Sequence, residues 1–154
     1  MKKLIAAALL SSVLVGGFAF AADPILGTWT ADLAKSKITS GPAPKALSRT
    51  YTESGGVYTL ESKSTAADGK QTSQSVQYRN GENMKVSGEA GVDTIAAKKI
   101  NERTWDFELK SGSKVMGRVH RVVSADGKTL SVHNTGTLPD GSKGDDHLVF
   151  EKQP

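Results

Sequence analysis

The chain has 154 residues and no cysteine, which excludes disulfides and a lipid-anchored N-terminal cysteine. Its formal net charge of +4 falls once Lys2 and Lys3, which lie in a predicted leader, are set aside, because 18 basic residues then face 16 acidic ones. This small net positive charge, together with the absence of a run of five like charges in the sequence, argues against nucleic acid as a partner.

The N-terminus has the pattern of a secretory signal peptide. Lys2 and Lys3 precede an apolar run over residues 4–18, and Ala19-Phe20-Ala21 then matches the small-x-small cleavage pattern. The apolar run is shorter than the roughly 20 residues of a membrane-spanning helix, and turn-type residues follow it directly. We therefore predict a signal peptide rather than a membrane anchor.

Residues 1–21 are expected to be the signal peptide, with Ala22 as the alternative last residue. No other stretch is long and apolar enough to cross a bilayer, so no stable membrane span is expected after cleavage. An exported chain without cysteine suits a bacterial periplasm, where folding need not depend on cross-links. We predict a periplasmic or secreted protein whose residues 22–154 form one domain.

The predicted domain alternates β-type runs with short turns. Asp-Gly and Asn-Gly pairs between runs rich in Val, Thr and aromatic residues are the strongest local signal for hairpins. Asp32 could cap a single helical turn, and residues 40–44, with two prolines, are expected to cross one end of the fold as an extended connector. The predicted strands are 25–31, 47–52, 57–65, 72–79, 84–87, 92–100, 104–110, 114–124, 129–137 and 145–152.

Short links between these strands decide the expected topology. Neighbours in sequence then become neighbours in space, whereas an immunoglobulin-like sandwich needs longer crossing connections. Pairing of the last strand with the first would close the sheet and remove its exposed edges. The predicted fold is all-β: an antiparallel up-and-down meander that closes into a barrel of eight to ten strands.

Two short motifs add a family resemblance. Gly27-Thr28-Trp29 on the first strand is similar to the Gly-x-Trp of the calycins, and Val149-Phe150-Glu151-Lys152 is similar to the terminal strand of the fatty-acid-binding proteins. The chain therefore resembles the lipocalin and fatty-acid-binding protein group. The resemblance implies a lipocalin-like protein that binds or carries a small, mainly apolar ligand inside the barrel, and the signal-peptide pattern adds the expectation that this protein is exported.

The sequence departs from that family in two places. The segment 32–46 is too short for the helical lid of the fatty-acid-binding proteins, and their carboxylate-binding arginine and tyrosine are matched here by Leu148 and Phe150. An ionised carboxylate in an apolar interior needs a cationic partner. We therefore expect the pocket to prefer neutral or aromatic apolar ligands over long-chain fatty acids.

Alternation along the strands gives the candidate ligand-binding residues. Each of the apolar ones could equally fill a packed core, because small barrels fill with their own side chains. Arg118 and Arg121 lie on one strand at odd spacing, so one of them could point inward toward an internal carboxylate or an anionic ligand, unless twist exposes it at a barrel mouth. The candidates are Tyr51, Leu60, Met84, Trp105, Phe107, Arg118, Arg121 and Phe150.

All three histidines lie in the C-terminal third. If Ser124 pairs with Thr129, His120 lies opposite His133, and a plausible last hairpin brings His147 alongside. A one-residue bulge would break this row, and in the unbulged register the histidines face outward. Metal or haem binding through His120, His133 and His147 is therefore a third functional alternative, behind exposed histidines without a ligand.

No pattern of residues predicts catalysis. No serine lies in a Gly-x-Ser-x-Gly context, and the adjacent Asp145 and Asp146 point to opposite faces of a strand. We expect a monomeric, non-enzymatic protein with no cofactor and no bound metal. The alternative to ligand binding is a structural or interaction protein of the cell envelope with a packed barrel and no ligand.

Overall fold

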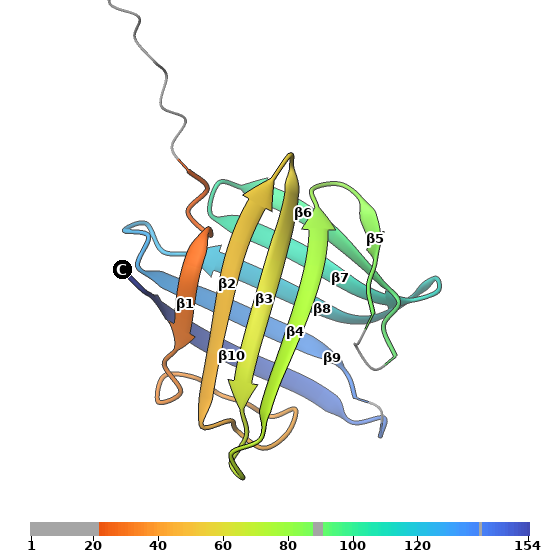
Figure 1. The fold of residues 1–154 in the computed structure, drawn as a ribbon. Helices are drawn as coiled ribbons and strands as arrows, with labels where there is room; N and C mark the ends of the chain where they lie inside the picture. The colour runs from red at the N-terminus through yellow and green to blue at the C-terminus, as the bar shows by residue number, and fades with distance from the viewer. Residues whose placement is uncertain (1–21, 88–90, 139) are drawn as a thin grey trace, which may run out of the picture.

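A computed structural model describes residues 22–87, 91–138 and 140–154. The predicted signal peptide lies outside the described residues. Within these ranges the chain forms ten strands, and every predicted strand has its counterpart (Figure 1). The strands are β1 (Gly27–Ala31), β2 (Ala46–Ser54), β3 (Val57–Thr65), β4 (Gln71–Arg79), β5 (Asn83–Lys85), β6 (Thr94–Asn101), β7 (Thr104–Ser111), β8 (Lys114–Val123), β9 (Thr129–Thr137) and β10 (Lys143–Lys152).

The strands form one antiparallel sheet in the order β4-β3-β2-β1-β10-β9-β8-β7-β6-β5. The predicted pairing of the first and last strands is confirmed, with Ala31 opposite Phe150. The remaining seam of the barrel lies between the edge strands β4 and β5, where the Gly81 amide donates to the Ala97 carbonyl at 2.8 Å. The all-β, up-and-down meander is thus confirmed as a nearly closed barrel.

Alternation along the strands places the core inside the barrel. On β7, Trp105 and Phe107 are buried and Asp106 and Glu108 face outward, as their two-residue period predicts. The hairpin between β8 and β9 has the unbulged register, because the Ser124 amide donates to the Thr129 carbonyl at 2.8 Å. This register fixes which side chains of the C-terminal third point inward.

One end of the barrel is plugged. Trp29 is fully buried and donates its indole N–H to the Ile25 carbonyl at 2.8 Å. The rings of Tyr58 and Tyr78 stack with centroids 5.4 Å apart, and both meet Trp105 edge-on. The cavity described below is lined by residues farther along β3 and β4, toward the opposite end of the barrel.

The connector between β1 and β2 crosses that opposite end (Figure 1). It begins with a turn in which the Lys35 amide donates to both the carbonyl and the Oδ1 of Asp32 at 3.2 Å, so Asp32 caps a single turn, which does not extend into a helix. Farther along, the amides of Thr39 and Ser40 donate to Asp146 Oδ1 at 2.7 and 2.9 Å. A buried carboxylate of β10 therefore ties the connector to the barrel. Among the described residues there is no helix long and apolar enough to cross a membrane.

Candidate ligand-binding site

A cavity of about 710 Å³ occupies the barrel beneath the connector. Strands β3, β4, β6, β7 and β8 give it apolar walls, which include Leu60, Val76, Ile95 and Val119. Ser62 and Asn134 add polar groups, and the connector contributes Ser40 at its mouth. A cavity of this size and mixed lining is typical of sites for small organic ligands.

Two arginines from opposite sides of the barrel reach this cavity. Arg49 lies on β2 and shares the inward face with Tyr51, while Arg121 lies on β8 and shares the inward face with Val119. Their positions follow from the period of two along each strand. The cavity therefore has a cationic region formed by side chains that are far apart in the sequence.

Aromatic rings support both guanidinium groups. The Arg121 Cζ lies 4.1 Å from the Phe107 ring centroid, and the rings of Tyr51 and Tyr78 lie 5.5 and 5.8 Å away. The Arg49 Cζ lies 4.9 Å from the Phe150 centroid. Such cation–π contacts hold the arginines in place and offset part of the cost of removing them from water.

Each of the two guanidinium groups has buried donors without a hydrogen-bond partner among the described residues. Arg121 is only 8% exposed, and the buried Nε and Nη1 atoms of both Arg49 and Arg121 have no hydrogen-bond partner among the described residues. Neither arginine forms an ion pair with a carboxylate in that part of the chain, although surface arginines such as Arg118 do. An unpaired buried charge is costly, so these donors suit an anion that the described residues do not supply.

Burial lowers the pKa of the Arg49 guanidinium, and the nearby charge of Arg121 lowers it further. An arginine still keeps its proton at physiological pH, because its ordinary pKa lies far above that range. The buried hydroxyls of Tyr51 and Tyr78 also lack a partner within the described ranges, and burial raises the pKa of Tyr78, so its hydroxyl stays a neutral donor. Together these groups offer fixed positive charge and hydrogen-bond donors to an acidic group.

The structure separates the candidate residues into four groups. Leu60 and Arg121 line the cavity, so Arg121 is the inward arginine. Arg118 borders the same space but points its guanidinium outward, where it meets Glu108 at 3.2 Å. Met84 is half-buried on the short strand β5, away from the cavity lining. The remaining four pack as the buried aromatic floor beneath the cavity: Tyr51, Trp105, Phe107 and Phe150.

Sequence reasoning missed Arg49, Ser62 and Asn134 as cavity residues. A signal for Arg49 was present in the sequence, because Arg49 stands two residues from both Leu47 and Tyr51 and therefore shares their face of the strand. It was overlooked because only the odd spacing of the two β8 arginines raised the question of an inward charge. For Ser62 and Asn134, no feature of the sequence indicated a place in the cavity wall.

The three histidines lie outside the cavity. His120 is opposite His133, and His133 is opposite His147, in the row that the unbulged register predicts. All three side chains lie on the outer face of the barrel, as expected. They cannot take part in a site inside the barrel.

No protein-family model and no curated protein matches the chain. Solved structures match it in fold. The fluorescent protein UnaG is 16% identical over 83% of this chain and 96% of that chain, with a TM-score of 0.59. Secretory abundant heat soluble protein 4 from Ramazzottius varieornatus is 16% identical over 86% and 96%, with a TM-score of 0.57. The zebrafish ileal bile acid-binding protein, solved with cholic acid, is 10% identical over 84% and 99%, with a TM-score of 0.54.

These matches extend over most of both chains and agree with the strand order described above. At such low sequence identities, the matches show the fold alone. The chain is a calycin-like β-barrel.

Proposed function

We propose that this protein binds a small, mainly apolar ligand that carries an anionic group, with a carboxylate as the simplest case. The observation that carries the proposal is that the buried Nε and Nη1 atoms of Arg49 and Arg121, beside a largely apolar cavity, have no hydrogen-bond partner among the described residues. The apolar part of the ligand would lie against Leu60, Val76 and Ile95, and its acidic group would meet the arginines. This reverses the expectation of a neutral ligand, which rested on Leu148 and Phe150 alone.

The structural relatives support a binding role for the fold. One is described as an extracellular fatty acid binding protein, As-p18, and another as a bile acid-binding protein in complex with cholic acid. Both named ligand classes join an apolar body to an acidic group. In the present chain, the Arg49 guanidinium stacks over Phe150, the residue that matches the tyrosine of the family clamp, so an arginine from β2 reaches the same region from another strand.

The test compares matched acids and alcohols. A polarity-sensitive dye is first bound to the barrel, and fatty acids, fatty alcohols of the same length and cholic acid are then used to displace it at neutral pH. We expect the acids to bind more tightly than the alcohols by about tenfold or more, because a charge-assisted bidentate contact adds to the same apolar burial. The readout is the dye fluorescence, with Trp105 emission as a second signal.

Three variants assign the effect to the interior arginines. Arg49→Met and Arg121→Met keep the length of the side chain and should each remove most of the preference for acids over alcohols. Arg118→Met removes an arginine of the outer face and should leave the preference unchanged. Equal binding of acids and alcohols by the unaltered protein would contradict the anionic anchor, and displacement by neither class would favour a structural barrel without a ligand.

We also propose that the protein is exported and acts in the periplasm or outside the cell. The support is the N-terminal pattern of Lys2, Lys3 and Ala19-Phe20-Ala21, together with the absence of cysteine. N-terminal sequencing of the protein from a periplasmic extract should find Ala22 or Asp23 first. Recovery of stable soluble protein that still begins with Met1 would overturn this assignment.

A further inference from the structure

A cluster of metal-binding side chains lies on the outer face of the barrel, independent of the cavity. His133 on β9 and His147 on β10 are directly opposed across the two strands. Asp145 precedes His147 by two residues, so its side chain points to the same face. The backbone of His147 is also held on its other side, because it exchanges two hydrogen bonds with Lys37 of the connector, at 2.7 and 2.8 Å.

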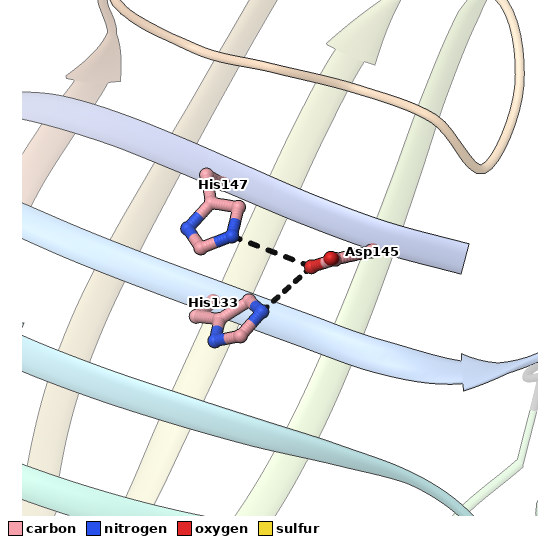
Figure 2. A group of neighbouring side chains, drawn as sticks. All are labelled: His133, Asp145 and His147. Carbon is pink, nitrogen blue, oxygen red and sulfur yellow. Dashed lines mark hydrogen bonds and ion pairs between the residues drawn. The ribbon is translucent and has the colours of Figure 1, made fainter. Parts of the chain in front are cut away.

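The three side chains converge on one point. The rings of His133 and His147 stack with centroids 3.9 Å apart and planes 16° apart. Their Nε2 atoms lie 2.7 and 3.3 Å from the same oxygen, Asp145 Oδ1 (Figure 2). The potential ligand atoms of all three residues fall within 4.8 Å of one another. Two imidazole nitrogens and a carboxylate oxygen therefore already face a shared centre.

We propose that His133, Asp145 and His147 bind a divalent transition-metal ion, with zinc as the best fit. Zinc is held by imidazole nitrogen and carboxylate oxygen at about 2.0–2.2 Å, which places neighbouring ligand atoms of a tetrahedron about 3.3–3.5 Å apart. The 3.3 Å separation already meets this spacing, and a small rotation of the exposed Asp145 side chain opens the 2.7 Å one. The fourth position would belong to water, since all three side chains are at least 40% exposed.

The types of ligand atom also predict which ions the site would not bind. Two imidazoles with one carboxylate suit zinc, nickel and copper, whereas magnesium and calcium prefer all-oxygen sites.

His120 is the neighbour in the row that does not join the site. It lies opposite His133 on β8, but its Nδ1 contacts Asp106 Oδ1 at 2.5 Å, on the side away from β10. His120 is therefore the control residue for the metal site. It is a histidine on the same face of the barrel that contacts a carboxylate, but it lies outside the group of His133, Asp145 and His147. The three-residue site predicts that removing His120 leaves metal binding intact.

The experiment is calorimetric titration of zinc chloride into the mature protein, prepared without a histidine tag and stripped with a chelator. We expect saturable binding of one ion per chain and a rise in the melting temperature on adding zinc, by mass action. His133→Gln and His147→Gln should abolish the rise, and Asp145→Asn should weaken binding by about tenfold or more. His120→Gln should bind as the unaltered protein does, and magnesium chloride should give neither heat nor stabilisation.

The side chains are exposed, so the variants are expected to fold, which circular dichroism can check. The site would be overturned by binding that survives His147→Gln and Asp145→Asn, by loss of binding in His120→Gln alone, or by no saturable binding at all. A stoichiometry of one ion per two chains would equally overturn it, because the ion would then bridge surfaces of two molecules. None of these outcomes depends on the cavity or on its ligand.

Discussion

The Arg121 guanidinium lies 4.1 Å from the centre of the Phe107 ring, in the interior of the barrel. The ring supplies an attractive quadrupole but no hydrogen-bond acceptor for the Nε and Nη1 atoms, which have no partner in the described part of the chain. Packing therefore fixes the position of the charge without neutralising it. A protein that needed this arginine only for its fold would gain from replacing it with an apolar side chain.

The first prediction follows from that imbalance. In the ligand-free protein, Arg121→Met should leave the free energy of unfolding unchanged or raise it by about 1 kcal/mol or more, because it removes an unpaired buried charge. The measurement is urea unfolding monitored by tryptophan fluorescence. Arg118→Met, on the outer face, should change stability by less than about 0.5 kcal/mol.

A loss of several kcal/mol in Arg121→Met would show that the guanidinium has a structural partner after all. A stabilised variant that also fails to bind acids would show that Arg121 serves the ligand at the expense of the fold.

The second prediction concerns the carboxylate that ties the connector to the barrel. Burial by itself would raise the pKa of Asp146, but hydrogen bonds from Ser40 and Thr39 outweigh burial and hold the pKa below its usual value. A group whose pKa is lowered by folding stabilises the fold above its unfolded pKa of about 3.9, and this stability disappears as the pH falls through the folded value. Asp146→Asn should therefore cost about 1–3 kcal/mol at neutral pH.

The difference between the unaltered protein and Asp146→Asn should shrink as the pH is lowered below about 4. Thermal unfolding at a series of pH values measures it, and Asp68→Asn, in an exposed turn, is the matched control. A difference that stays constant down to the acid limit would mean that the charge of Asp146 does not stabilise the connector.

The fold was largely predictable because its signals are local. Period-two alternation places Trp105 and Phe107 inside, and the Asp126-Gly127 turn sets His120 opposite His133. The position of the seam was not predictable in this way. The position of the seam depends on how strands far apart in sequence curve toward each other. The first and last strands pair as predicted, but this pairing leaves the barrel open between the edge strands β4 and β5.

The site was less predictable than the fold. Alternation predicts which face of the sheet a side chain points to, but not how far along the barrel axis it lies. Tyr51 was therefore expected to line the cavity, but it is packed in the buried aromatic floor. Arg49, two residues earlier, lines the cavity instead. The histidine row was foreseen from register. The additional carboxylate of Asp145 was not, because its convergence on His133 and His147 depends on side-chain rotamers.

The third prediction tests the plugged end of the barrel. Asp23 Oδ2 accepts hydrogen bonds from Lys99 Nζ at 2.5 Å and from the Tyr58 hydroxyl at 2.8 Å, and its side chain is only 8% exposed. Asp23→Ala would leave the Lys99 ammonium without its carboxylate beside the aromatic core. We expect a loss of about 1–3 kcal/mol in urea unfolding.

The control for the plugged end is Lys35→Ala, which breaks exposed ion pairs with Asp32 and Glu151 and should have a small effect. An equal loss in the two variants would indicate that Asp23 contributes no more than a surface charge. A large loss would agree with a mature chain that retains Asp23.

The fourth prediction concerns the close approach of β8 and β9 at the mouth of the cavity. Gly117 is paired with Gly136, and a Cβ added at Gly117 would lie 2.8 Å from the Thr135 carbonyl oxygen and 3.5 Å from the Gly136 Cα. Because both neighbours are backbone, rotation of a side chain cannot relieve the clash, and the two strands must separate. Gly117→Ala should therefore cost about 1–3 kcal/mol, as small-to-large changes in packed sites do.

The control is Gly41→Ala in the connector, where an added Cβ meets nothing within 4 Å. This variant should have close to the unaltered stability in the same urea titration. Since Gly117 also lines the cavity, separation of the strands should weaken ligand binding in Gly117→Ala as well as stability. Full stability in Gly117→Ala would mean that the β8–β9 spacing is not set by the absence of a side chain at this pair.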